Sequence, residues 1–197
     1  MEKFIIEKTK FNDVLVITPR VFVDNRGYFC ETYNKLQLTN LNFNIDFVQD
    51  NESKSKKNVI RGLHYQWLSP MGKLVRVVSG AIIDVVVDIR KDSLTYGDHV
   101  KFKISAKNKK QLWVPSGFAH GMLSLEEDTL VSYKCSAFYN PEGESAISPF
   151  DKDLNIDWET NLKNINISDK DLVAESFKSY KKNPKFWENK MKYVVTG

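Results

Sequence analysis

The chain has 197 residues, a formal net charge of +4 and 42% hydrophobic residues, which suits one domain with a sizeable core. No apolar run reaches the roughly 20 residues that a membrane span needs. The opening residues MEKFIIEKTK lack the apolar centre of a signal peptide, so we expect a cytoplasmic protein that binds no membrane.

The basic residues are mostly dispersed lysines, and only five of the 29 are arginines. A nucleic-acid binder would gather its basic residues, arginine included, on one surface, so we expect no nucleic-acid partner. The two cysteines, Cys30 and Cys135, lie far apart without a metal-binding or redox spacing. We interpret both as reduced, structural thiols.

The first part of the chain alternates short extended runs with turns. In chain order we expect two β-type runs within residues 11–23, a turn over 24–27 between extended segments, a short helix within 34–46, a strand over 47–51 and a polar loop over 53–58.

The middle of the chain then shows strands at regular spacing. They cover residues 59–66, 73–80, 81–90, 99–106, 111–117, 120–127 and 129–139, and turn residues join them. Many short strands at such intervals, without βαβ alternation, predict a closed or sandwiched all-β domain. We interpret residues 1–197 as a single domain. Its tail, from about residue 174 to 197, packs on the barrel with short helical turns on each side of Pro184.

The stretch VIRGLHYQ, residues 59–66, places Arg61 and His64 close together in a strand. In a regular strand these two side chains point to opposite faces. A β-bulge at Gly62 would re-aim one of them, and we expect such a distortion. The chain has three histidines and no H-x-H pair, so we do not expect the three ligands of a catalytic metal.

Three other residues are ambiguous when each is taken alone. Asp84 lies inside the apolar run AIIDVVVDIR, where it is either satisfied by a backbone amide or lysine or orients a histidine. Lys73 opens a strand and would ordinarily be solvated. Tyr133 alternates with Val131 and Cys135, as a core tyrosine would.

Taken together, six separated motifs carry a more specific signal. RGLH, KLV, DVVVDIR, VPSGFAHG, YKCSAFYNP and ISDKD follow one another between about Thr18 and Asp171. In order and spacing they resemble the nucleotide-sugar 3,5-epimerases, specifically the dTDP-4-dehydrorhamnose 3,5-epimerase family of the cupin superfamily. The resemblance implies a jelly-roll β-barrel or sandwich with short C-terminal helices. It also implies proton transfer next to a C4 ketone, with no cofactor and no metal.

The resemblance implies a role for each catalytic candidate. His64 would be the base oriented by Asp171, Lys73 would stabilise the C4 oxyanion, Tyr133 would be the acid, and His120 backed by Asp84 would bind near the sugar oxygen. The substrate would be a dTDP-4-keto-6-deoxyhexose, inverted at C3 and C5.

The resemblance also implies the binding residues. Arg61 and Arg26 would hold the phosphates, Phe29 and Glu31 would meet the thymine with Gln49 and Asn51 nearby, and Tyr139 would stack on the nucleoside. In the family the N-terminal segment can cross a dimer interface, so we expect a homodimer.

Two alternatives remain open at this point. One is a relative that inverts only C3 or only C5, or that takes another nucleotide-linked 4-keto sugar. The other, of a different class, is a non-catalytic jelly-roll module that binds sugar nucleotides. Such a module would have no reason to combine His64, Lys73, Tyr133 and Asp171.

Overall fold

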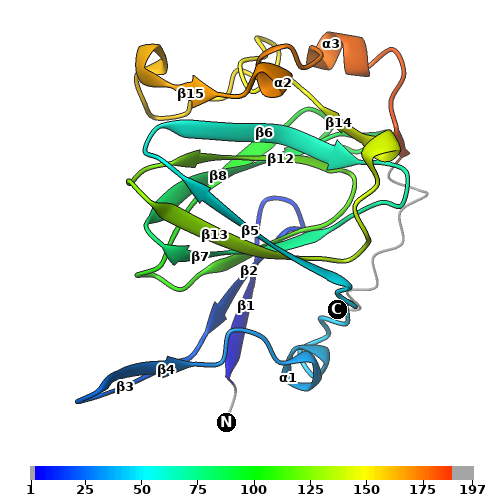
Figure 1. Ribbon diagram of the computed structural model, residues 1–197. Helices are drawn as coiled ribbons and strands as arrows, with labels where there is room; N and C mark the ends of the chain where they lie inside the picture. The colour runs from blue at the N-terminus through cyan, green and yellow to red at the C-terminus, as the bar shows by residue number, and fades with distance from the viewer. Residues whose placement is uncertain (1–2, 188–197) are drawn as a thin grey trace.

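The computed structural model describes residues 3–187, and two antiparallel sheets form its centre (Figure 1). The first sheet has the order β1-β2-β11-β7-β13-β5 and the second the order β10-β8-β12-β6-β14, with β15 added parallel to β6. The all-β jelly-roll class predicted from the sequence is confirmed.

The strands have the following bounds. In the first sheet they are β1 (Phe4–Lys8), β2 (Leu15–Pro19), β5 (Gln49–Ser55), β7 (Lys73–Ser79), β11 (Gln111–Val114) and β13 (Thr129–Cys135). In the second they are β6 (Val59–Gln66), β8 (Ala81–Asp88), β10 (His99–Ser105), β12 (Phe118–Ser124), β14 (Glu144–Ala146) and β15 (Asn166–Ile167). Outside the sheets lie the hairpin of β3 (Val21–Asp24) and β4 (Gly27–Cys30) and the pair β9 (Arg90–Lys91) and β16 (Phe186–Trp187).

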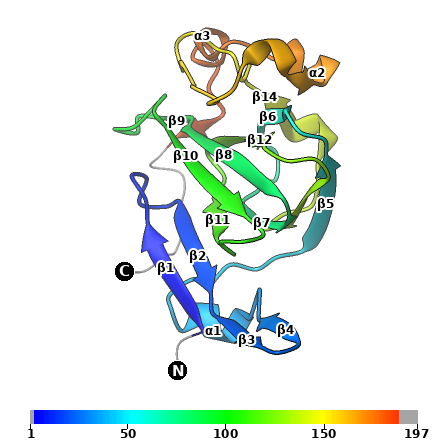
Figure 2. The ribbon, with the colours of Figure 1, turned by 90° about the vertical axis from the view of Figure 1, so that its left-hand side faces the viewer.

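Helices are short and lie outside the sandwich. They are α1 (Lys35–Thr39), α2 (Asp169–Leu172), α3 (Phe177–Tyr180) and the 3-10 turns η1 (Pro141–Gly143) and η2 (Leu162–Asn164). Helix α1 lies under the first sheet, whereas α2 and α3 lie over the second (Figures 1 and 2). No helix in the described part of the chain is long and apolar enough to cross a membrane.

Strand β8 is buried along its whole length, which explains its nearly continuous apolar sequence. Ile83, Val85 and Val87 pack with the C-terminal segment, including Phe177. The alternate side chains, such as Val86, pack between the two sheets. Asp84 belongs to this inward set, so the fold places a carboxylate between the sheets, where only a functional or paired group is tolerated.

Two local expectations were wrong. The polar stretch that was expected to be a loop from residue 53 continues strand β5 to Ser55, because its backbone pairs with β13 over the full length. Within the described residues after Pro184, strand β16 pairs parallel with β9 where a helical turn was expected, because buried Phe186 joins the core beneath it. Residues 188–197 of the predicted tail lie outside the described residues.

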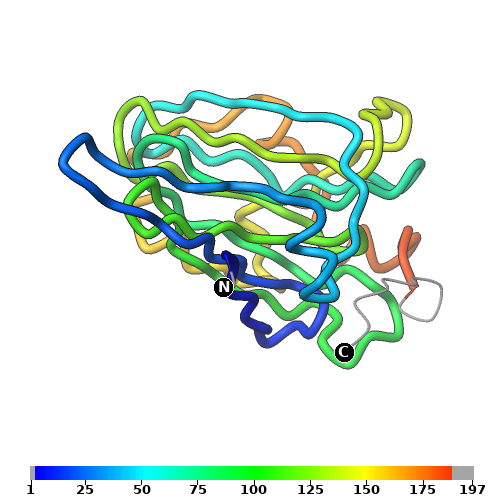
Figure 3. Tube along the Cα trace, turned by 90° about the horizontal axis from the view of Figure 1, so that it is seen from below, coloured from blue at the N-terminus to red at the C-terminus, as the bar shows by residue number. Residues whose placement is uncertain are grey.

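The β3–β4 hairpin projects from the body of the molecule (Figures 1 and 3). Among residues 3–187 its two strands pair only with each other, from Val21 opposite Cys30 to Asp24 opposite Gly27. Large apolar side chains on it are exposed, among them Val23 at 78% and Phe29 at 68%. A two-stranded hairpin with exposed apolar side chains is marginal in water, so this arm is suited to contact another surface.

Candidate active site

Strand β6 contains the bulge predicted at Gly62. Its pairing with β12 sets His64 opposite His120 but Arg61 opposite Met122, so β6 has one extra residue in this stretch. As a result Arg61 and His64 line the same cavity although they are three residues apart. The expected distortion is confirmed, and it explains how strand β6 directs the side chains of both Arg61 and His64 into the cavity.

Two glycines allow the backbones to approach closely at this bulge. A Cβ atom on Gly62, whose φ is +125°, would lie 2.5 Å from the Cα of Gly121. A Cβ atom on Gly121 would lie 2.9 Å from the carbonyl oxygen of Arg61. Only glycine fits at these contacts, and the two neighbouring histidines are thereby brought to one cavity.

The cavity between the sheets has a volume of about 230 Å³. Its polar lining is Ser53, Arg61, His64, Lys73, His120, Tyr133 and Glu144, and its apolar lining includes Val75, Met122 and Val131. These residues come from β5, β6, β7, β12, β13 and β14. The structure therefore gathers five of the predicted site residues, from distant parts of the chain, around one space that a hexose could enter.

His64 forms a dyad with Asp171. The Nε2 atom of His64 lies 2.6 Å from Oδ1 of Asp171, and the backbone N–H of Gly62 donates to Oδ2 at 3.2 Å. Burial raises the pKa of Asp171, but the hydrogen bonds from His64 and Gly62 outweigh it and hold this pKa below its ordinary value. An ionised Asp171 only accepts, so neutral His64 donates through Nε2–H. The Nδ1 atom is then the free basic nitrogen.

His120 forms a second dyad with Asp84. Its Nε2 lies 2.7 Å from Oδ1 of Asp84, and the Asp84 side chain is fully buried. The other carboxylate oxygen, Oδ2, has no hydrogen-bond partner among the described residues. The sequence alone was compatible with either a structural or an orienting role for Asp84. In the structure Asp84 is hydrogen-bonded to His120, which lines the cavity.

Lys73 and Tyr133 face the histidines from the first sheet. The Nζ atom of Lys73 lies 5.8 Å from the centre of the Tyr133 ring. Burial lowers the pKa of Lys73 and raises that of Tyr133. The raised pKa of Tyr133 keeps its phenol protonated at neutral pH, as a proton donor must be.

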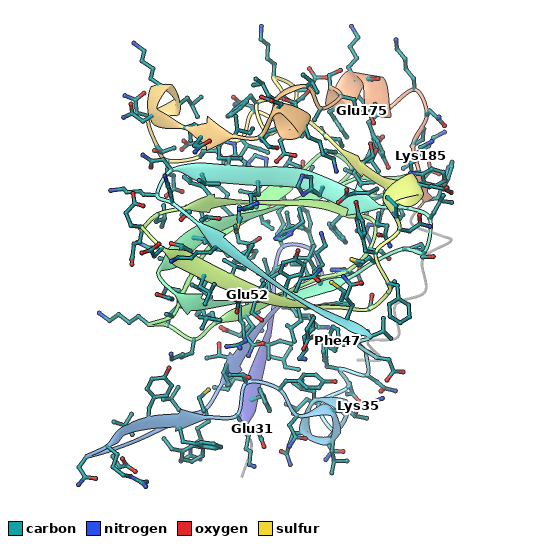
Figure 4. All side chains as sticks on the ribbon, in the orientation of Figure 1. Glu31, Lys35, Phe47, Glu52, Glu175 and Lys185 are labelled. Atoms are coloured by element: carbon teal, nitrogen blue, oxygen red, sulfur yellow. The ribbon has the colours of Figure 1, made fainter. Side chains whose placement is uncertain are left out.

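The predicted binding residues fall into two groups. Arg61 lines the cavity and donates from Nε to Oγ of Ser55 at 3.1 Å. Hydrogen bonds link Gln49 to Asn51 and Tyr139 to Gln49, and the Tyr139 hydroxyl donates to Glu144, which lines the cavity. By contrast, Arg26, Phe29 and Glu31 lie on or just after the projecting hairpin and do not line this cavity, and Figure 4 shows Glu31 below the sandwich.

The sequence reasoning missed Glu144 and Lys170. Glu144 lines the cavity from β14, accepts from the Tyr139 hydroxyl at 3.1 Å and pairs with Lys170. Burial raises the pKa of Glu144, but the contact with Lys170 outweighs it and lowers the net value. Lys170 stands next to Asp171 in ISDKD, which was a usable signal, whereas Glu144 lies in a loop-like stretch without one.

Neither a thiol pair nor a metal cluster accompanies these residues. Cys30 and Cys135 are free thiols, as predicted. Across residues 3–187, no three His, Cys, Asp or Glu side chains come together as metal ligands would. The histidine dyads, the Tyr133 phenol and the basic side chains of Arg61 and Lys73 around this cavity suit acid–base transfer next to positive charge.

Comparisons with known proteins agree with this arrangement. A family model described as dTDP-4-dehydrorhamnose 3,5-epimerase matches residues 8–179. The curated enzyme of that name from Methanothermobacter thermautotrophicus is 43% identical over 93% of this chain and 98% of its own. The crystal structure of dTDP-6-deoxy-D-glucose-3,5-epimerase from Legionella pneumophila, in complex with dTDP-4-keto-L-rhamnose, superposes with a TM-score of 0.84. It is 40% identical and covers 88% of this chain and 92% of its own.

A more distant structure shows how widely the fold is used. The 3'-monoepimerase from Streptomyces bikiniensis, in complex with dTDP-quinovose, has a TM-score of 0.81 at 27% identity, over 89% of each chain. The family model itself also matches most of the present chain. With the two dyads, the lysine and the tyrosine around one cavity, the chain belongs to the dTDP-4-dehydrorhamnose 3,5-epimerase family.

Proposed function

We propose that the protein converts dTDP-4-dehydro-6-deoxy-D-glucose into dTDP-4-dehydro-L-rhamnose by inverting C3 and C5. The observation that carries this proposal is the single cavity in which an Asp171-oriented His64 faces Lys73 and Tyr133. A non-catalytic module would not need a carboxylate buried behind a histidine in its binding cavity. The apolar wall of Val75, Met122 and Val131 suits the methyl group of a 6-deoxy sugar.

The C4 ketone makes the protons on C3 and C5 acidic. Nδ1 of His64 removes one of these protons, and the electron pair moves to the C4 oxygen as an enolate. The ammonium of Lys73 and the His120–Asp84 dyad stabilise that negative charge in a site of low dielectric. The Tyr133 hydroxyl returns a proton to the other face of the carbon, which inverts the centre and leaves a phenolate. Exchange with solvent removes the proton from His64 and restores the one on Tyr133, so the same pair can act on the second carbon.

The second candidate is inversion at one carbon only, since the similar enzyme from Streptomyces bikiniensis is a 3'-monoepimerase. The test is to incubate the protein with dTDP-4-dehydro-6-deoxy-D-glucose and to read the product by NMR. Ring coupling constants distinguish inversion at both carbons from inversion at one. We expect both centres inverted, and a product inverted at C3 or C5 alone would replace our proposal with the second candidate.

We further propose a homodimer in which each hairpin serves the partner's site. Arg26, Phe29 and Glu31 carry the predicted nucleotide contacts, but they lie on or just after a hairpin that projects from the body of the molecule (Figure 3), and they do not line the cavity of their own chain. The exposed apolar side chains of that arm fit burial against a second copy of the chain. In a symmetric dimer both sites would gain the same contacts.

Shared sites predict that two inactive variants restore each other. Co-expressed Arg26→Ala and His64→Ala chains form mixed dimers in which one of the two sites has an intact arm and an intact base. With random pairing, about half the dimers are mixed, so we expect about a quarter of wild-type activity in the purified mixture.

The matched control for this mixture is His64→Ala with Tyr133→Phe. Both changes lie in the same sandwich, so no mixed dimer has a complete site and activity should stay at the sum of the two variants. If Arg26→Ala and His64→Ala also show only their summed activities, the arm serves its own chain and the shared-site proposal fails.

Chelation should leave the activity unchanged. The proposed steps use only side chains of this chain. The lysine and the histidines stabilise the negative charge on the C4 oxygen, which a metal ion would otherwise do. The measurement is the epimerisation rate after exhaustive dialysis against a chelator. Activity lost on dialysis and restored by one divalent metal would contradict the metal-free mechanism.

A further inference from the structure

We propose that Asn51 is a positioning residue for the Tyr133 acid: its amide donates to the phenol oxygen and thereby turns the phenol hydrogen into the cavity. This inference rests on the proposed function, since it concerns the proton that Tyr133 delivers. It assigns Asn51 a task different from the thymine contact that the sequence suggested.

The direction of the Asn51 amide is fixed by a chain of hydrogen bonds. The backbone N–H of Tyr139, which can only donate, lies 2.9 Å from Oε1 of Gln49. The NH₂ group of Gln49 therefore faces the other way and donates to Oδ1 of Asn51 at 3.0 Å. The Asn51 carbonyl is thus occupied, and its NH₂ group must point toward β13.

Two groups on β13 meet that NH₂ group. Asn51 lies directly opposite Tyr133 in the β5–β13 pairing, with both side chains on the inner face. One N–H of Asn51 is directed to the buried Sγ of Cys135 at 3.7 Å. The second N–H is then available to the phenol oxygen of Tyr133, the cross-strand neighbour.

When the phenol oxygen of Tyr133 accepts a hydrogen bond from Asn51, the hydroxyl still has its single hydrogen to donate elsewhere. With the Asn51 side occupied by a donor, that hydrogen points toward the cavity that Tyr133 lines. The same hydrogen bond also makes the phenol more acidic. Burial raises the pKa of Tyr133, and the hydrogen bond with Asn51 acts against that rise. Asn51 thus favours both the direction and the release of the proton.

The experiment compares inversion with proton exchange in deuterated water. In Asn51→Ala, His64 still removes protons, so deuterium exchange with retained configuration should persist while inversion falls about tenfold, the order expected for one hydrogen bond. The ratio of inverted product to exchanged substrate is measured on the same molecules, so partial unfolding of a sample does not alter it.

Asn51→Asp separates positioning from packing. Aspartate keeps the size of asparagine but has no N–H to donate, and it would accept the phenol hydrogen and turn it away from the cavity. We expect the inversion-to-exchange ratio to be lower in Asn51→Asp than in Asn51→Ala. A purely structural role would make the isosteric aspartate the milder change, and that order would overturn the proposal.

Glu52→Gln is the control, since Glu52 is the next residue of β5, faces outward and is exposed (Figure 4). It should keep the wild-type ratio. If Asn51→Ala raises KM and lowers exchange and inversion in parallel, Asn51 serves nucleotide binding instead, and the inference is wrong. Wild-type protein that does not invert the substrate at all would be a failure of the proposed function, which the same NMR spectra would show separately.

Discussion

Replacing His64 by alanine is expected to abolish proton exchange at both C3 and C5. A single general base contributes on the order of 10²–10⁴-fold to the rate, and His64 is the cavity histidine whose dyad with Asp171 leaves Nδ1 free. Binding of dTDP should be unchanged, because Arg61 and Tyr139 remain in place. The measurements are deuterium incorporation by NMR and dTDP affinity by calorimetry.

Asp171→Asn is the matched variant for this prediction. The asparagine amide can donate to Nε2 of His64, which would place the histidine proton on Nδ1 and remove the basic atom from the cavity. We expect a loss of similar order with the dyad's geometry kept. Near wild-type exchange in His64→Ala would assign the base to another residue, with His120 the first to examine.

Replacing Tyr133 by phenylalanine is expected to separate exchange from inversion. His64 should still form the enolate, and without the phenol the proton returns slowly or from the original face. Inverted product should fall on the order of 10²–10⁴-fold, while solvent deuterium still enters substrate of unchanged configuration. The ring keeps its packing, so the melting temperature should change little.

The control for Tyr133→Phe is its dTDP affinity, which should equal that of the wild type. A normal yield of inverted sugar from this variant would show that water or another side chain is the acid. Equal loss of exchange and inversion would instead indicate that the phenol acts on enolate formation, together with Lys73.

How much of this molecule the sequence predicted depends on the kind of signal. The regular strands from residue 59 onward follow from alternating or continuous apolar runs, as in β8, and these were predicted. The predicted strand over residues 47–51 ended before the true end of β5 because the inner face of β5 is polar. Residues such as Asn51 and Ser53 face the cavity and its surroundings, so this segment has no hydrophobic periodicity. The pairing of β5 with β13 is a long-range contact, and the local sequence pattern does not predict it.

The site likewise has features that the local sequence predicts and features that depend on tertiary contacts. Gly62 predicted a bulge, because a strand cannot otherwise direct Arg61 and His64 to one cavity, and the structure has it. Nothing local indicated Glu144, since its place depends on β14 pairing with β6 next to His64. The orientation of the Asn51 amide likewise follows only from a chain of contacts that begins at Tyr139.

The most direct test of the central claim is the deuterium content of the product that the unaltered protein makes in deuterated water. Proton abstraction and return next to the C4 ketone predict solvent deuterium at both C3 and C5 of the inverted sugar, seen by NMR as loss of both proton signals. Inverted product that keeps its original hydrogen at either carbon would contradict the mechanism at that centre.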